Sequence, residues 1–166
     1  MDEFSLSFDL PHPDDTDKLG ALFAGFIADN QAILAREGLT VHLDGNLGAG
    51  KTSFVRATLR ALHFQGPVKS PTFSLVETYP IGQLTVNHFD FYRFEDPMEF
   101  EDAGFRDFFG PGFVTFTEWT DKAQPYVPTA DIVIELTHVG LGRHARLSAL
   151  SDLGCTVLTD IQKRHA

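Results

Sequence analysis

The residues best able to do chemistry form one segment, Gly45-Asn46-Leu47-Gly48-Ala49-Gly50-Lys51-Thr52. This segment fits the pattern G-x-x-x-x-G-K-[ST], which binds nucleotide phosphates where a strand is followed by a helix. Its glycines allow backbone N–H groups to converge on a phosphate at the positive end of the helix dipole. In such a site Lys51 bridges the β- and γ-phosphates, and the Thr52 hydroxyl binds Mg²⁺. We therefore predict that the segment, together with Ser53, binds a nucleoside triphosphate and magnesium.

A site of this kind also needs a carboxylate at the end of a neighbouring strand, to hold the metal ion or its water. Asp90 follows the expected strand at 84–89, and Glu118 ends the expected strand at 113–117. Spacing alone leaves a second interpretation open for both, because either could be a solvated carboxylate at a strand end. His88 should face the same side of its strand as Asp90, and an isolated histidine is more often a structural group.

Ser70-Pro71-Thr72-Phe73 lies between the helix that follows the glycine-rich segment and the strand that leads to Asp90. Switch segments of nucleotide-binding proteins occupy this position and carry a hydroxyl that senses the γ-phosphate or the metal ion. By position alone, a plain turn is the favoured interpretation of this segment. The acidic residues between Asp90 and Asp107 also have two interpretations, a docking surface for a basic partner or a solvated helix face.

Hydrophobic periodicity predicts the elements that position these residues. The expected strands are 3–10, 39–43, 72–78, 83–91, 113–118, 130–137 and 143–150, and the expected helices are 14–36, one containing 54–62, and a short one at 97–103 continued at 105–109. Strands alternate with helices in the first half and follow one another in the second. This order predicts a three-layer α/β fold of the P-loop NTPase type, with a mixed, mostly parallel central sheet.

Composition limits the remaining possibilities. With 166 residues, 43% of them hydrophobic, the chain can form one core, and we expect a single P-loop ATPase domain over 1–166. The net charge of -10 disfavours free, non-specific binding to nucleic acid. The single cysteine, Cys155, suggests no disulfide, zinc or redox site. No apolar stretch approaches the roughly 20 residues of a membrane helix, and the acidic start does not fit a secretory signal, so we expect a cytoplasmic protein.

Taken together, these segments resemble one family, the TsaE family of small bacterial P-loop ATPases. The resemblance runs from residue 15 to residue 158. Its ordered blocks are Gly45 to Thr52, Ser70 to Phe73 with Leu75-Val76, His88-Phe89-Asp90-Phe91-Tyr92-Arg93, Glu118-Trp119, and Gly142-Arg143 with Arg146. The first block is shared by very many proteins, whereas the later blocks at these separations are specific to few.

Members of this family assist threonylcarbamoylation of the adenosine next to the anticodon of tRNA. The resemblance implies that Thr52, Asp90 and Glu118 surround Mg²⁺ and that Thr72 lies near the γ-phosphate. It also implies that Trp119 lines the nucleotide site or stiffens its edge. Lys51, Asp90 and Glu118 are then the expected catalytic residues, although which carboxylate positions the attacking water stays open. ATP and Mg²⁺ are the implied cofactors. The implied partner is a TsaB–TsaD heterodimer, with tRNA contacted indirectly through that complex and hydrolysis slow without it.

Two positions depart from the family pattern: Asn46 stands where an acidic residue is usual, and Thr120 where proline commonly follows tryptophan. Neither change removes a phosphate or metal ligand. A nucleotide-sensing scaffold with little turnover and a nucleoside-type kinase remain as alternatives, although a kinase usually has several arginines over the phosphates. A GTPase is disfavoured because the sequence has no N-K-x-D motif. Arg143 and Arg146 are candidate contacts for tRNA or a partner, or part of a solvated strand edge.

Overall fold

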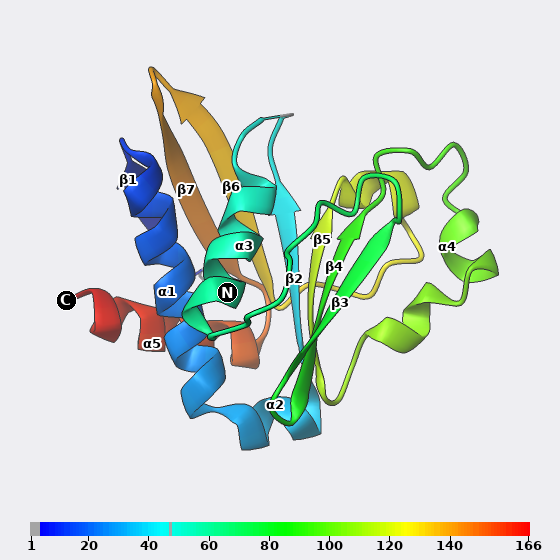
Figure 1. The fold of residues 1–166 in the computed structure, drawn as a ribbon, viewed down its shortest axis with the longest axis horizontal. Helices are drawn as coiled ribbons and strands as arrows, with labels where there is room; N and C mark the ends of the chain where they lie inside the picture. The colour runs from blue at the N-terminus through cyan, green and yellow to red at the C-terminus, as the bar shows by residue number, and fades with distance from the viewer. Residues whose placement is uncertain (1–3, 47) are drawn as a thin grey trace.

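The computed structural model describes residues 4–46 and 48–166. Within them, seven strands form one sheet in the order β1-β7-β6-β2-β5-β4-β3, with helices packed around it (Figure 1). The strands are β1 (Ser5–Leu10), β2 (Leu39–Asp44), β3 (Val76–Ile81), β4 (Leu84–Asp90), β5 (Phe113–Glu118), β6 (Ile132–Val139) and β7 (Gly142–Ala149). The α-helices are α1 (Pro13–Asp29), α2 (Gln31–Glu37), α3 (Lys51–Ala61), α4 (Glu99–Asp102) and α5 (Asp152–His165), and the 3₁₀ helices are η1 (Phe105–Phe108) and η2 (Thr120–Ala123).

The centre of the sheet is parallel, because β6, β2, β5 and β4 run in the same direction. At the edges, β3 pairs with β4, β7 with β6, and β1 with β7, all antiparallel. The predicted α/β fold with a mixed, centrally parallel sheet is therefore confirmed. Since parallel strands end at the same edge, the register places Leu43 beside Glu118, and Glu118 beside Asp90. The end of β2, which leads into the glycine-rich segment, thus lies next to both candidate carboxylates.

The larger hydrophobic core lies between the sheet and helices α1, α3 and α5. The ring of Phe54 in α3 lies 5.2 Å from that of Phe23 in α1 and 6.0 Å from that of Phe116 in β5. Gly20 allows the two helices to approach closely, because a Cβ atom there would lie 2.7 Å from the Cβ atom of Ala57. The helix that follows the glycine-rich segment is therefore fixed both to α1 and to the sheet.

A smaller aromatic core lies on the other face of β4. Side chains alternate along a strand, so Val86 packs in the larger core whereas Phe89 packs in the smaller one. Phe89 stacks on Phe91 with ring centroids 5.3 Å apart, and Phe105 of η1 contacts Phe89 edge-on at 5.0 Å. This core holds η1 and α4 against the sheet. By the same alternation, His88 faces α3 together with Asp90, as predicted.

Three expected elements differ in the structure. The single helix expected at 14–36 is broken at Asn30, where the side-chain amide donates to the Phe26 carbonyl at 2.9 Å, a local hydrogen bond that competes with helix continuation. The strand expected from residue 72 begins at Val76, because the chain before it turns and Leu75 has a left-handed φ of 71°. The segment after Leu158, for which no structure was predicted, belongs to α5.

Ser151 is the N-cap of α5, and its side-chain oxygen accepts the Gly154 N–H at 3.0 Å. Arg164 near its end donates to Asp29 at 2.6 Å, which ties α5 to the end of α1. Over the described ranges, none of the helices combines the length and the apolar character needed to cross a membrane.

Candidate nucleotide site

The glycine-rich segment turns sharply between β2 and α3. Gly45 and Gly50 have φ angles of 153° and 101°, in the region that side chains with a Cβ atom rarely adopt. A Cβ atom on Gly45 would also lie 2.6 Å from the Leu136 carbonyl oxygen. Gly50 directly precedes α3, so the segment delivers its backbone to the amino-terminal end of that helix. This is the strand, turn and helix arrangement that phosphate binding requires. Leu47, one of the predicted binding residues, lies outside the described residues.

Lys51 is held at the start of α3 by its own loop and by an aromatic ring. Its Nζ atom donates to the Gly45 carbonyl at 2.7 Å and lies 4.1 Å from the centre of the Trp119 ring. Burial lowers the pKa of the Lys51 ammonium, and the charges of Glu118 and Asp90 oppose that shift. The ammonium therefore lies where a phosphate of a bound nucleotide would complete its charge pairing.

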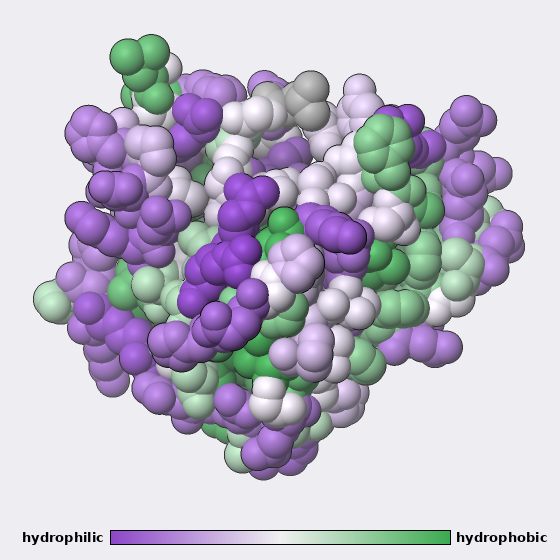
Figure 2. All heavy atoms as spheres, in the orientation of Figure 1, coloured by the Kyte–Doolittle hydropathy of each residue, from purple (hydrophilic) through white to green (hydrophobic). Residues whose placement is uncertain are grey.

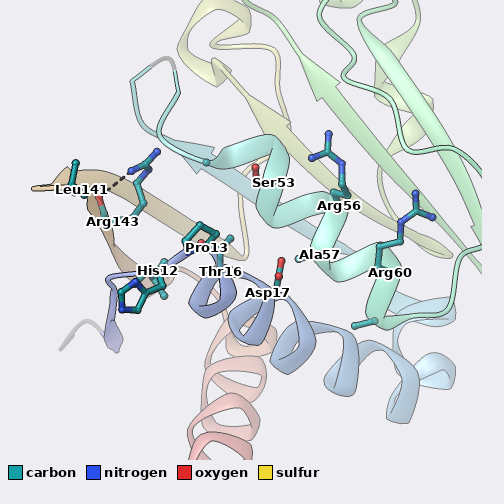
Figure 3. Close-up of a pocket in the computed structure, with 14 residues that line it drawn as sticks. His12, Pro13, Thr16, Asp17, Ser53, Arg56, Ala57, Arg60, Leu141 and Arg143 are labelled. Atoms are coloured by element: carbon teal, nitrogen blue, oxygen red, sulfur yellow. Dashed lines mark hydrogen bonds between the residues drawn. The ribbon is translucent and has the colours of Figure 1, made fainter.

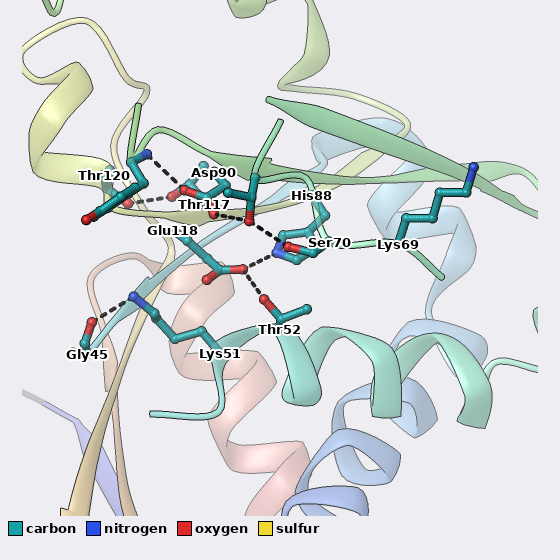
Figure 4. A network of polar contacts seen from close by, with 12 residues as sticks. Gly45, Lys51, Thr52, Lys69, Ser70, His88, Asp90, Thr117, Glu118 and Thr120 are labelled. Atoms are coloured by element: carbon teal, nitrogen blue, oxygen red, sulfur yellow. Dashed lines mark hydrogen bonds and ion pairs between the residues drawn. The ribbon is translucent and has the colours of Figure 1, made fainter. Parts of the chain in front are cut away.

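Thr52 and Glu118 meet directly, although 66 residues separate them in the sequence. The Thr52 hydroxyl donates to Glu118 Oε2 at 2.9 Å, and the Nε2 atom of His88 contacts the same oxygen (Figure 4). Burial alone would raise the pKa of Glu118. The hydrogen bonds from His88 and Thr52, and the charges of His88 and Lys51, outweigh this effect and hold its pKa below the ordinary value. Glu118 is therefore an ionised, oriented carboxylate.

Asp90 lies beside Glu118 and is bonded differently. Its Oδ1 atom accepts the backbone N–H of Tyr92 at 2.8 Å, and its Oδ2 atom accepts the Thr72 hydroxyl at a longer 3.4 Å. The Ser70 and Thr72 hydroxyls are 2.8 Å apart. Burial raises the pKa of Asp90, and the neighbouring charge of Glu118 adds to that effect. The structure thus brings the Ser70–Phe73 segment to the candidate carboxylates, with Thr72 as the contact.

Trp119 and Thr120 form the corner after β5. Trp119 adopts a left-handed backbone conformation, with φ 55° and ψ 42°, which is strained for a residue with a bulky side chain and common at functional sites. Its ring contacts the Lys51 ammonium and also the Tyr92 ring, whose centroid lies 5.0 Å away. The Thr120 hydroxyl bonds to that of Thr117 at 2.7 Å, so threonine secures this corner where proline is usual.

Arg143 of β7 holds the glycine-rich segment through two of its backbone carbonyl groups. Its guanidinium donates to the Ala49 carbonyl at 3.1 Å and to the Gly48 carbonyl at 3.0 Å. The sequence presented Arg143 as a possible tRNA or partner contact, and the structure gives it this internal role. The two carbonyl groups lie 94 and 95 residues earlier in the chain, so only the folded structure reveals this role.

Two hollows adjoin the glycine-rich segment. The smaller one, of about 280 Å³, is lined by residues that include Asn46, Lys51 and Trp119. The larger one, of about 640 Å³, lies between α1 and α3 and opens next to Gly50 and Ser53 (Figure 3). Its other lining residues include His12, Pro13, Thr16, Asp17, Arg56, Arg60 and Arg143. The residues contributed by α1 had no sequence signal of their own.

The donor set suits magnesium held jointly with a nucleotide. Within the described part of the chain, no three His, Cys, Asp or Glu side chains form a metal-binding group. The oxygens of Thr52, Glu118 and Asp90 nevertheless gather at one edge of the sheet beside the glycine-rich turn. Mg²⁺ prefers oxygen ligands and is commonly held by one or two carboxylates plus substrate phosphates. These residues therefore fit a Mg²⁺–nucleotide complex better than a metal cage made by protein alone.

The model of the family "Threonylcarbamoyl adenosine biosynthesis protein TsaE" matches residues 10–146. The chain belongs to the TsaE family. The TsaE protein of Haemophilus influenzae is 40% identical over 121 residues, which cover 73% of this chain and 77% of that protein. The TsaE protein of Nostoc is 34% identical over 146 residues, covering 80% and 87% respectively. TsaE is a family of tRNA threonylcarbamoyladenosine biosynthesis, so the resemblance seen in the sequence is confirmed.

The fold agrees with this TsaE membership. The crystal structure of Bacillus subtilis YdiB superimposes with a TM-score of 0.75 and covers 100% of this chain and 99% of that chain. Its sequence identity is 22%, so this match supports the fold alone. The sequence of the Bacillus subtilis TsaE protein is 33% identical over 129 residues, covering 78% of this chain and 75% of that protein.

Proposed function

We propose that this TsaE chain is a Mg²⁺-dependent ATPase that supports threonylcarbamoyladenosine modification of tRNA by acting on a TsaB–TsaD complex. The observation that carries the proposal is the 2.9 Å hydrogen bond between Thr52 and Glu118. It joins the end of the phosphate-binding turn to a buried carboxylate on the adjacent strand, as a metal-dependent phosphate site requires.

Different residues of the chain bind the phosphates, the metal ion and the nucleoside. The backbone N–H groups of the glycine-rich turn and the Lys51 ammonium hold the phosphates, and Arg143 fixes the turn through its carbonyl groups. Thr52 and Glu118 hold Mg²⁺, which when bound neutralises charge that develops on the β- and γ-phosphate oxygens. The larger hollow beside Ser53 offers space for the nucleoside. None of the lining residues described there identifies adenine, so ATP is proposed as the nucleotide from the resemblance to the TsaE family.

The two carboxylates have different roles in this proposal. Glu118 is ionised and bonded to Thr52, which suits a metal ligand. Asp90 has a raised pKa and is bonded to the Thr72 hydroxyl, so it lies between the metal site and the switch-like segment. We assign Asp90 to orient the attacking water, and Thr72 to respond to the γ-phosphate.

The surface that we propose for the partner includes the Ser70–Phe73 segment. Phe73, next to Thr72, is 83% exposed, and the Arg93 guanidinium lies 4.3 Å from the centre of its ring. Tyr92 and Met98 are also exposed hydrophobic residues, and Figure 2 shows hydrophobic surface on the side of the molecule where α4 lies. Exposed aromatic and arginine side chains are typical anchors of protein interfaces. We place the nucleotide-dependent contact with TsaB–TsaD on this surface.

The deciding experiment measures phosphate release from ATP and from GTP, with the chain alone and with TsaB–TsaD. The Lys51→Ala variant provides the blank. ATP-selective release that rises with TsaB–TsaD and disappears in Lys51→Ala supports the proposal. Tight ATP binding without any effect of TsaB–TsaD on turnover would favour a nucleotide-sensing scaffold instead. Phosphate transfer to an added nucleoside would identify a kinase.

A further inference from the structure

His88 is fully buried on β4, with 0% of its surface exposed. Its Nε2 atom contacts Glu118 Oε2, the oxygen that also accepts the Thr52 hydroxyl (Figure 4). An ionised carboxylate has no proton to donate, so His88 Nε2 is the donor. One oxygen of Glu118 therefore receives two hydrogen bonds, from α3 and from β4.

The other ring nitrogen of His88 indicates that histidine does not give the highest fold stability at this position. Its Nδ1 atom is buried and has no hydrogen-bond partner among the described residues. Burying a polar atom without a partner lowers stability, and an apolar side chain of similar size would avoid that penalty. The stability of the sheet therefore does not account for a histidine here, whereas its contact with Glu118 does.

A second buried histidine provides the comparison. His42 lies on β2, the strand that leads into the glycine-rich turn, and its Nε2 atom lies 3.2 Å from the Pro128 carbonyl. That contact links the His42 side chain to the backbone at Pro128 and includes none of the candidate ligands. Of these two buried histidines, His88 is the one that contacts the nucleotide site.

We propose that His88 is a positioning residue for the metal ligand Glu118. Two donors on Oε2 prevent the carboxylate from rotating unless both hydrogen bonds break, so Glu118 is oriented before any metal ion arrives. Such outer partners of metal ligands commonly change metal affinity by about 10–100-fold when they are removed. This proposal rests on the proposed function, because it takes Thr52 and Glu118 as the Mg²⁺ site.

The test uses Mn²⁺ as a probe, measured by electron paramagnetic resonance with a non-hydrolysable ATP analogue present. We expect His88→Leu to weaken Mn²⁺ binding about 10–100-fold, the range seen for outer partners of metal ligands. His88→Gln should recover most of the affinity, because its side-chain amide can donate to Glu118. Nucleotide affinity measured in EDTA should stay at the parent value in both variants. His42→Leu is the matched control and should leave Mn²⁺ affinity unchanged.

Several results would overturn the proposal. Parental Mn²⁺ affinity in a folded His88→Leu variant would do so, and so would an equal loss of metal-free nucleotide affinity, which would indicate general damage. In a Glu118→Gln background the effect of His88→Leu should disappear, and its persistence would also contradict the proposal. If His88→Leu does not fold, His88→Asn replaces it, because that shorter amide does not reach Glu118. A parent protein that binds neither nucleotide nor Mn²⁺ would instead refute the proposed function.

Discussion

The two halves of the candidate site differ in how firmly they are held. On the metal side, Thr52, His88 and Glu118 belong to α3, β4 and β5, and the Thr52–Glu118 bond is 2.9 Å long. On the switch side, Thr72 lies in an irregular segment, and its bond to Asp90 is 3.4 Å long. Side chains on regular, buried elements keep their geometry, whereas exposed loops open and reorder at low free-energy cost. In the proposed function, the firmly held half binds the ligand and the other half responds to it.

Removing the Lys51 ammonium should have the largest effect on ATP turnover. Lys51→Ala should lower ATP turnover by about 100-fold or more, because a preorganised charge at the phosphates is lost. Circular dichroism should show an unchanged fold, since Lys51 makes its contacts with its own loop and with Trp119. Turnover near the parental value would contradict the assignment of the site.

The two carboxylates should separate metal binding from chemistry. Glu118→Gln should lower Mg²⁺ affinity for the nucleotide complex by about 100-fold or more, because losing a ligand costs at least as much as the 10–100-fold lost with an outer partner. Asp90→Asn should lower turnover by about 100-fold, the scale of general acid–base effects, with Mg²⁺ affinity close to that of the parent. Calorimetric Mg²⁺ titrations and phosphate release measure the two quantities. The reverse pattern would exchange the roles assigned to these residues.

Removing the Thr72 hydroxyl, which bonds to Asp90, should have a smaller effect on turnover. Thr72→Val keeps the shape of the side chain but removes the bond to Asp90. Since the lost hydrogen bond is worth about 1 kcal/mol net, turnover should fall by about fivefold. Stopped-flow phosphate release measures the change, with Thr78→Val, an exposed position on β3, as the control. Equal effects of the two substitutions would argue against a special role for Thr72.

The smallest effect on turnover by the chain alone should come from the exposed aromatic residue. Phe73→Ser should reduce the stimulation of ATP turnover by TsaB–TsaD by about tenfold, because an interface anchor typically contributes more than 1 kcal/mol. Stimulation is measured as the ratio of rates with and without TsaB–TsaD. Leu150→Ser removes another exposed hydrophobic residue, at the end of β7 and outside the proposed surface, and serves as the control. A parental ratio in Phe73→Ser would place the partner contact elsewhere.

The order of strands and helices predicted the mixed, mostly parallel sheet, and the resemblance to the TsaE family implied that Asp90 and Glu118 lie together, as their register now shows. The sequence also predicted that His88 and Asp90 share a face. It did not predict the tie from Arg143 to Gly48 and Ala49, because no local pattern records a contact made across the sheet. The break at Asn30 and the left-handed Trp119 were missed because single side chains and corner geometry decide them.

The register of the parallel strands has a consequence for how this chain tolerates insertions and deletions. Leu43, Glu118 and Asp90 lie side by side across three strands. Adding or deleting one residue within β4 or β5 would turn the carboxylate to the opposite face, away from α3. Length changes in the loops after these strands would leave that alignment intact. Variation in length among functional relatives should therefore fall between strands, and an insertion or deletion of one residue inside β5 should abolish function.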